Sequence, residues 1–200
     1  MYRPDGYLYR LDGLIGGQYG DKENGAFFSH MNVMFAYALY KQGKVKEAWH
    51  VAHSLYAMSL ATEKSKIYPC LPEYFDITGR GMYSYLTGSA SWFVLTLLTQ
   101  SLGIKGENGD LVCEPKLCKE QFGNSTFIAL KRSFAGRSLL IRFHNPERLD
   151  WGEYQIRSIT CDESDVPEIE INGIKAVIKR KFILSLSKNR VHTVNILFSR

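Results

Sequence analysis

The sequence predicts a multi-domain α+β protein, with helices over residues 1–106 and a small antiparallel β-sandwich over residues 107–200. Two observations predict this division. Up to residue 106, apolar residues recur with the period of a helix between glycine and proline breaks, whereas further on apolar and polar residues alternate, as in strands with one buried face. The chain of 200 residues is long enough for one ordinary domain or two small ones.

The helical part begins after residues 1–26, a stretch rich in glycine, tyrosine and aspartate that is typical of a loop. Residues 27–42 (FFSHMNVMFAYALYKQ) are apolar on most sides, which predicts a buried helix. Gly43 predicts the end of that helix, because glycine readily adopts the left-handed conformation that closes a helix.

A second helix is expected over residues 44–61, and the short turn at Gly43 predicts an antiparallel hairpin with the first. Helical spacing marks its inner face as Val45, Ala48, Trp49, Ala52, Leu55 and Tyr56. Prolines and glycines interrupt residues 62–86, and a third helix follows over residues 89–102. Long helices joined by long loops are typical of a barrel of helical hairpins, although three helices alone cannot close one.

The second part contains five segments with the alternation of strands. They are STFIALKRSF, SLLIRFHNP, EYQIRSITC, PEIEINGIKAVIKRKFILSL and RVHTVNILFSR. The dipeptide Asn172–Gly173 in the fourth segment predicts a hairpin turn. We therefore expect an antiparallel β-sandwich.

The charge and hydropathy patterns exclude several classes of partner. The net charge is +5, but the only dense basic run is residues 179–181, which is too short for a nucleic-acid patch. No apolar run approaches the roughly 18 residues of a membrane span, and the first 20 residues lack the apolar core of a signal peptide. We expect no nucleic acid, no membrane and a cytoplasmic location.

The cysteine and histidine spacings predict no metal site. The four cysteines are Cys70, Cys113, Cys118 and Cys161. Their spacing fits neither C-x-x-C nor a zinc-ligand pattern, so we expect free thiols in a reducing compartment. His50 and His53 are three residues apart, but no third ligand accompanies them.

The segment YLTGSASW, residues 85–92, contains the start of the third helix. Thr87 and Ser89 can each cap that helix, and Gly88 between them lets the backbone come close to a ligand. Because a helix start presents unpaired N–H groups, the segment is either an anion cradle or an ordinary cap. His30, one turn into the first helix, is either a donor to an anion or sugar, or a core histidine.

The loop LPEYFDITGRG, residues 71–81, holds further candidates. Glu73 and Asp76, with tyrosines nearby, can hold sugar hydroxyls or perform the acid–base work of glycoside cleavage; alternatively, they are simply exposed. Arg80 is the cation closest in sequence to the proposed cradle, and can contact phosphate or anchor the loop.

Taken in order, several motifs resemble the C-terminal third of glycoside hydrolase family ninety-four, formerly glycosyltransferase family thirty-six. They are ENGAFFSHMN, PEYF, GRGMYSYLTGSASW, LGIKGENGDLVCEPKL and RSFAGRSLLIRFHNP. The family includes cellobiose, chitobiose and cellodextrin phosphorylases. The resemblance covers residues 20–146, and its most specific feature is the T-G-S-A-x-W element together with E-N-G shortly before a histidine.

The resemblance implies the last hairpins of an (α/α)6 barrel followed by a jelly-roll-like β domain. It also implies inverting phosphorolysis, in which inorganic phosphate attacks the anomeric carbon of a β-glucoside while an aspartic acid protonates the leaving oxygen. Phosphate is then a co-substrate, and no other cofactor is implied. Phosphate is assigned to His30, Thr87 and Gly88, and substrate to Tyr74, Glu73 and Arg80.

The chain departs from the family at two points. The general acid of the family lies upstream, in a D-W-N-D-like stretch that these residues lack, so we expect no catalytic residue here and a partner in the missing N-terminal portion or a second copy of the chain. The family reads E-P-Y where this chain has Pro72, Glu73 and Tyr74. Two alternatives stay open: a non-catalytic or degenerate carbohydrate-binding protein, and a hydrolase that uses Glu73 or Asp76.

Overall fold

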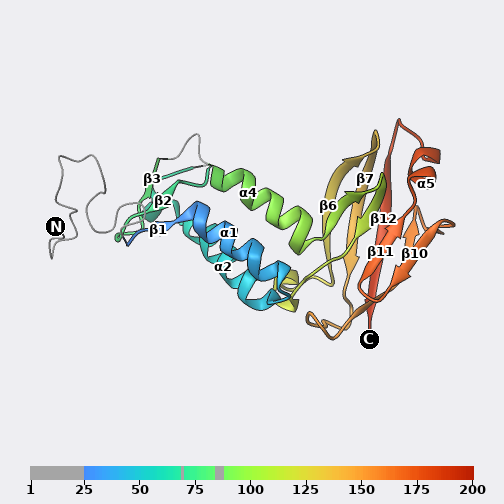
Figure 1. Ribbon diagram of the computed structural model, residues 1–200, viewed down its shortest axis with the longest axis horizontal. Helices are drawn as coiled ribbons and strands as arrows, with labels where there is room; N and C mark the ends of the chain where they lie inside the picture. Colours follow the sequence, from blue (N-terminus) through green and yellow to red (C-terminus); the bar gives the residue numbers. More distant parts are fainter. Residues whose placement is uncertain (1–24, 69, 84–87) are drawn as a thin grey trace. The chain divides into compact units, whose positions relative to one another are not determined.

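The computed structural model describes residues 25–68, 70–83 and 88–200 (Figure 1). The chain forms two compact units, Met1–Thr96 and Leu97–Arg200. Helices dominate the first unit and several sheets, mostly antiparallel, make up the second, so the predicted α+β class is confirmed. The second unit begins earlier than the change of sequence period after residue 106.

The first unit contains α1 (Ser29–Lys41), α2 (Val45–Leu60), the short α3 (Thr62–Ser65) and α4 (Gly88–Thr96). α1 packs along both α2 and α4 (Figure 1). The chain continues from α4 into a π-helical turn, Leu97–Ser101.

Gly43 ends α1 as the sequence predicts. Its φ angle is +73°, which is the left-handed region. The N–H of Gly43 donates to the carbonyl of Tyr40 at 3.1 Å, and the N–H of Lys44 donates to that of Leu39 at 2.9 Å. These two bonds form a Schellman motif, which satisfies carbonyl groups that the helix end leaves open.

The inner face of α2 is mostly the predicted one. Its buried residues are Val45, Ala48, Ala52 and Leu55. The two aromatic members of the predicted face differ, because Trp49 is only half-buried and Tyr56 is exposed. The core of the unit consists of Val33, Leu55, Ile67 and Phe75.

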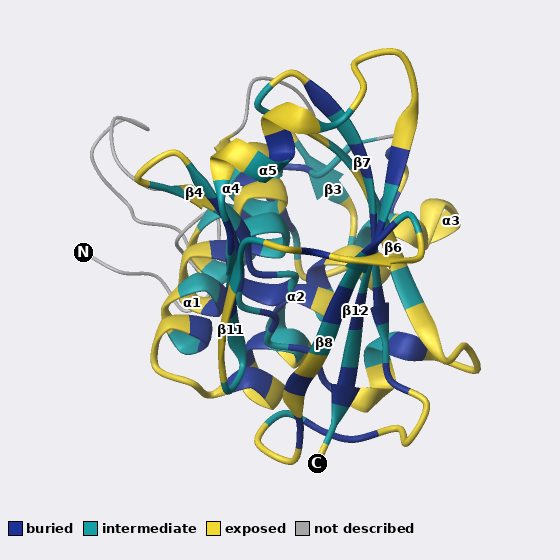
Figure 2. Cartoon of the chain, turned by 90° about the vertical axis from the view of Figure 1, so that its right-hand side faces the viewer, coloured by how far each residue is buried: buried dark blue, intermediate teal, exposed yellow. Residues whose placement is uncertain are grey.

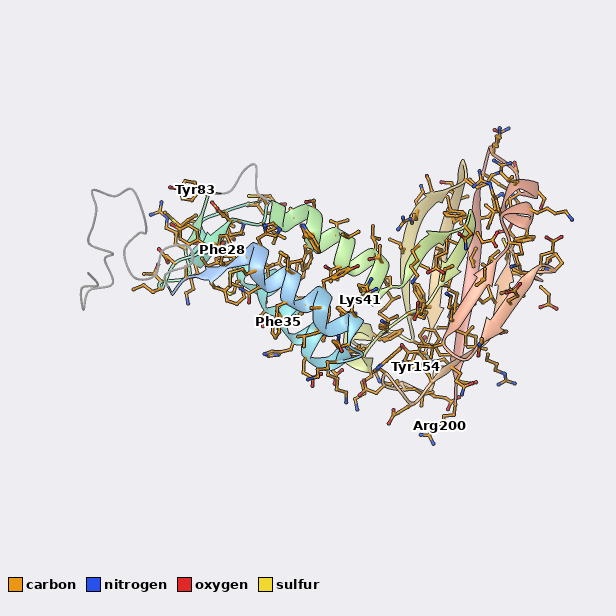
Figure 3. The ribbon with its side chains drawn as sticks, in the orientation of Figure 1. Phe28, Phe35, Lys41, Tyr83, Tyr154 and Arg200 are labelled. Atoms are coloured by element: carbon orange, nitrogen blue, oxygen red, sulfur yellow. The ribbon has the colours of Figure 1, made fainter. Side chains whose placement is uncertain are left out.

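The prediction that α1 is buried all round is wrong. Val33, Ala36 and Tyr40 are buried, but Met31, Met34 and Phe35 are 57%, 46% and 56% exposed (Phe35 is labelled in Figure 3). Among the described residues of this unit, only one face of α1 is covered by α2 and α4. The other face therefore remains an unpartnered apolar surface.

α4 is also unusual, because it buries polar residues and exposes apolar ones. Ser89 and Thr96 are fully buried, whereas Val94 and Leu95 are 53% and 43% exposed. The hydroxyl of Thr96 is satisfied within the helix, since it donates to the carbonyl of Trp92 at 2.8 Å. This arrangement is typical of a helix whose apolar side needs a further partner.

A small three-stranded sheet forms from residues that the sequence assigned to the start of the first helix and to the loop of residues 62–86. Its strands are β1 (Phe27–Phe28), β2 (Tyr74–Phe75) and β3 (Gly81–Met82), in the order β1-β2-β3. Phe28 pairs with Tyr74, which pairs with Met82. Phe28 and Tyr83 thus lie at the same end of the helices (Figure 3). Because β1 directly precedes α1, this pairing holds the loop of residues 70–83 next to the start of α1.

Two sheets enclose the core of the second unit. One has the order β6-β7-β12-β8-β9 and the other β10-β11-β5-β4. The first comprises β6 (Phe127–Phe134), β7 (Arg137–His144), β8 (Gln155–Cys161), β9 (Ser164–Asp165) and β12 (Val191–Ser199). The second comprises β4 (Ile104–Glu107), β5 (Asp110–Cys113), β10 (Ile169–Asn172) and β11 (Lys175–Ile178). Buried and more exposed residues alternate along β12, as the sequence predicts (Figure 2).

The hairpin predicted at Asn172–Gly173 is confirmed, since β10 and β11 pair there in antiparallel register. Two expectations for this unit are wrong. β12 pairs with β7 in parallel, so the five-stranded sheet is mixed. Residues 180–185, expected to continue a strand, form the helix α5 (Arg180–Ser185). A carboxylate from β5 starts this helix, because Asp110 Oδ1 accepts from the N–H of Arg180 at 2.8 Å.

None of the helices in the described part of the chain is long and apolar enough to cross a membrane.

Candidate functional site

The starts of α1 and α4 are tied to the same loop. The N–H of Ser29, the first residue of α1, donates to the carbonyl of Glu73 at 2.8 Å. The hydroxyl of Ser89, in the first turn of α4, donates to the carbonyl of Pro72 at 3.2 Å. The N-termini of two helices are therefore both tied to the adjacent residues Pro72 and Glu73.

His30 lies directly beside Gly88. A Cβ atom built on Gly88 would be 3.2 Å from Cε1 of His30 and 3.5 Å from its Nε2. Nε2 of His30 is buried and has no hydrogen-bond partner among the described residues. A buried polar atom without a partner costs about 1–3 kcal/mol, so such an atom calls for an explanation.

Gly88 opens α4 and is exposed. The first N–H groups of a helix lack partners within the helix and carry a partial positive charge. Because position 88 has no side chain, the start of α4 can approach the imidazole of His30 closely, and any Cβ there would be in tight contact with the ring. Thr87, the third residue assigned to phosphate, lies outside the described residues, so the structure brings together two of the three.

Two neighbours of His30 were not anticipated from the sequence. Ser29 Oγ is also buried without a hydrogen-bond partner among the described residues. Trp92 packs near the imidazole, with ring centroids 6.1 Å apart, and Tyr37 contacts Trp92 edge to face at 5.6 Å. The sequence does offer signals for both neighbours. In FFSHMN a serine directly precedes the histidine, and in GSASW a tryptophan lies one turn into the next helix.

The residues assigned to substrate occupy different environments. Tyr74 is buried and its ring lies 6.0 Å from that of Tyr83. Glu73 is half-buried, and its N–H donates to the carbonyls of Met82 and Tyr83. Arg80 is exposed, and its main chain pairs with Asp76.

Asp76 organises the loop. Its Oδ1 accepts hydrogen bonds from the N–H of Thr78 at 2.8 Å, the hydroxyl of Thr78 at 2.6 Å and the N–H of Arg80 at 3.0 Å. Burial acts to raise the pKa of Asp76, but these bonds outweigh it and hold the pKa below the ordinary value of 3.8. A general acid needs a raised pKa, so the environment of Asp76 is that of a turn-forming carboxylate.

No family model and no curated protein matches this chain. The features that point to a function are therefore the buried Nε2 atom of His30 and the helix start beside it.

Proposed function

We propose that the first unit holds inorganic phosphate for an inverting glycoside phosphorylase that acts on β-linked glucose oligosaccharides. The observation that carries this proposal is the buried Nε2 of His30, which lacks a partner among the described residues and lies beside Gly88 at the start of α4. A tetrahedral oxyanion there would accept from the imidazole and from the main-chain N–H groups of the helix start.

The reaction exchanges one C–O bond for another. A phosphate oxygen attacks the anomeric carbon, the bond to the leaving oxygen breaks, and a carboxylic acid transfers its proton to that oxygen. His30 and the start of α4 would position the attacking phosphate, with inversion at the anomeric carbon. Phosphate is the co-substrate, and the proposal needs no other cofactor.

The proposal assigns the proton donor to a part of the enzyme outside these 200 residues, as the resemblance implies. The lowered pKa of Asp76 supports this assignment, because an ionised carboxylate cannot donate a proton. A hydrolase that uses Asp76 as its acid is disfavoured for the same reason.

The proposed fold is the end of an (α/α)6 barrel followed by a jelly-roll-like domain. The exposed apolar residues of α1 and α4 support the barrel, since further hairpins would cover them. Met31, Met34 and Phe35 are spaced by three and four residues, which is the spacing of one helix face. The proposed partner is accordingly the remaining helical portion of the enzyme, or a second copy of the chain.

The experiment is thermal unfolding of the chain in increasing phosphate or sulfate. A tenfold excess over the dissociation constant should stabilise the folded state by about 1.4 kcal/mol. His30→Ala should abolish this anion-dependent stabilisation, whereas His50→Ala, which changes an exposed histidine of α2, should keep it. Equal stabilisation of both variants by the anion would contradict the proposal.

The alternative function is a non-catalytic carbohydrate-binding protein that uses the same pocket. The hydrogen bonds of Asp76 favour this alternative, because they give the carboxylate a structural role in the loop and not the role of a general acid. Formation of glucose 1-phosphate from β-linked oligosaccharides by the chain together with its upstream portion distinguishes the two. Anion binding without any such product supports the alternative.

A further inference from the structure

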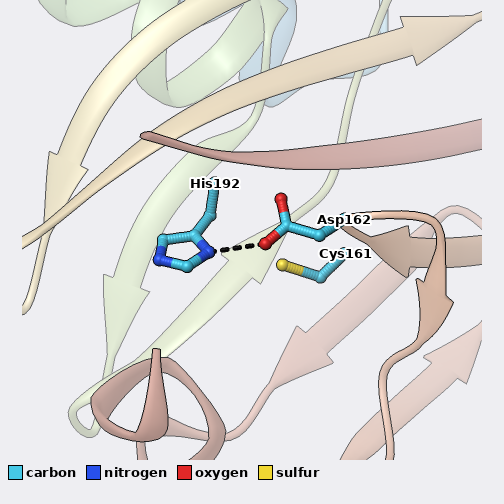
Figure 4. Close-up of side chains that lie close together, drawn as sticks. All are labelled: Cys161, Asp162 and His192. Atoms are coloured by element: carbon cyan, nitrogen blue, oxygen red, sulfur yellow. Dashed lines mark hydrogen bonds and ion pairs between the residues drawn. The ribbon is translucent and has the colours of Figure 1, made fainter. Parts of the chain in front are cut away.

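Three side chains with different ligand chemistry meet at one end of the five-stranded sheet. Cys161 is the last residue of β8, Asp162 follows it in the turn to β9, and His192 lies in β12. The thiol sulfur, a carboxylate oxygen and a ring nitrogen all lie within 4.8 Å of one another (Figure 4). Cys161 and His192 are buried, and the Asp162 side chain is 27% exposed.

The hydrogen bonds of His192 leave one ring nitrogen facing this cluster. Nε2 lies 3.0 Å from the carbonyl oxygen of Ser187, which can only accept, so Nε2 carries a hydrogen. Nδ1 lies 2.7 Å from Oδ2 of Asp162. A ring lone pair and an ionised carboxylate oxygen this close need a cation between them, either a proton or a metal ion.

The surroundings of Asp162 favour the ionised form of its carboxylate. Burial acts to raise the pKa of Asp162, but the bonds from Thr193 N–H and His192 and the charge of Arg190 hold the pKa below its ordinary value. Thr193 N–H donates to Oδ1 at 2.9 Å, which orients the carboxylate and leaves Oδ2 toward the imidazole. Ser187 orients the ring in the same way. Metal sites commonly show such outer hydrogen bonds to their ligands.

Asp162 and Glu163 are the two central residues of the hairpin turn that joins β8 to β9. Their φ angles of +50° and +68° are positive, as a two-residue hairpin turn of type I′ requires. A proton explains the bond between His192 and Asp162, and Cys161, a residue of the buried core, brings a thiol within reach of both groups.

We propose that Cys161, Asp162 and His192 bind a divalent transition-metal ion of the zinc class. Thiolate, imidazole and carboxylate are the ligand types that zinc selects. The ligand atoms of a tetrahedral zinc ion are about 3.3–3.7 Å apart. Binding would therefore lengthen the distance between Nδ1 and Oδ2 by less than about 1 Å. Three protein ligands leave a fourth position for water.

Proton release balances the binding step. Burial raises the pKa of the Cys161 thiol to about 11, so the metal must displace the thiol proton, as well as any proton that Nδ1 shares with Asp162. Arg190 competes with the metal, because its Nη2 lies 2.7 Å from Asp162 Oδ2. The Arg190 side chain is 64% exposed and can turn into solvent when the cation binds.

The sequence did not predict this site because its ligands come from different strands. Asp162 and His192 are 30 residues apart, and no short spacing pattern connects them. The sequence-based expectation of no metal concerned local motifs such as His50 and His53, both exposed on α2. The cluster arises only when β12 pairs with β8.

The first test is titration of the chelator-treated chain with Co²⁺, a spectroscopic substitute for zinc. We expect a single bound ion per chain and a sulfur-to-cobalt charge-transfer band in the near ultraviolet. Cys161→Ser should remove the band and weaken binding by more than about 100-fold, since even outer-shell changes cost about 10- to 100-fold. Cys70→Ser, which removes a half-buried thiol of the first unit, should leave the band intact.

The second test uses Arg190→Gln, which keeps all three ligands. Removing the competing cation should tighten Co²⁺ binding by about fivefold, the scale of one partly exposed ion pair. A purely structural ion pair would instead give no cobalt band in any variant. Failure of folded wild-type protein to show the band at millimolar Co²⁺, or a band that survives Cys161→Ser, would overturn the proposal.

Discussion

The imidazole of His30 and the bare Cα of Gly88 lie so close that a methyl group on Gly88 would sit 3.2 Å from the ring. Position 88 has no left-handed backbone angle, so alanine is tolerated there without backbone strain. The added methyl group would fill the space in which we place the anion.

Gly88→Ala should therefore weaken phosphate binding, and the methyl group should also push the imidazole of His30 aside slightly. We expect the ligand-free free energy of unfolding to fall by about 1 kcal/mol, the cost of a mildly overpacked contact. Thermal unfolding with and without phosphate measures both quantities. Undiminished stabilisation by phosphate in this variant would contradict the placement of the anion.

Arg137→Met should destabilise the second unit by about 3 kcal/mol. Arg137 is 8% exposed, and its guanidinium donates to the carbonyls of Leu184 and Leu186 at 2.6 Å each, at the C-terminal end of α5. The substitution leaves both carbonyls without their charged donor. Chemical denaturation followed by circular dichroism tests this, with Lys131→Met on the exposed side of β6 as a control of similar chemistry. A loss no larger than that of the control would contradict the role given to Arg137.

Asp76→Ala should lower stability at neutral pH by about 1–2 kcal/mol, because three hydrogen bonds to one carboxylate oxygen are lost. The pKa of Asp76 is depressed in the folded state, so its contribution is present above the ordinary value of 3.8. The contribution then disappears as the pH falls through the folded-state pKa. Urea unfolding of both proteins from pH 7 downward should show a constant difference that shrinks below pH 3.8. A difference that persists in strong acid would argue for another cause.

Phe35→Ser should reduce self-association of the chain without destabilising it. The side chain is 56% exposed on the unpartnered face of α1, next to Met31 and Met34. Removing it takes apolar surface from an interface but not from the core. Sedimentation velocity measures the association, and thermal unfolding measures the stability. A large fall in the unfolding temperature would show that Phe35 is buried in the isolated chain.

Local signals accounted for much of the fold. The Schellman motif at Gly43, the buried side of α2 and the hairpin between β10 and β11 follow from glycine conformation and residue spacing. Such features depend on residues within one or two turns of each other, so a single sequence contains the information. The proximity of His30 to Gly88 was also expected, although only through the family resemblance.

Contacts between distant residues were much harder to anticipate. Residues 180–185 alternate like a strand, yet Asp110, 70 residues earlier, caps their first N–H and favours a helix. Phe27 and Phe28 looked like the start of a helix, but pairing with Tyr74 and Phe75 draws them into a sheet. In both cases a partner from elsewhere in the chain outweighs the local preference.

The position of β12 has a consequence for biosynthesis. This strand, residues 191–199, lies between β7 and β8 and pairs with both. The sheet cannot be assembled until those residues have left the ribosomal exit tunnel. Until then the backbone N–H and C=O groups of β7 and β8 that pair with β12 are open to chaperones and to other nascent chains.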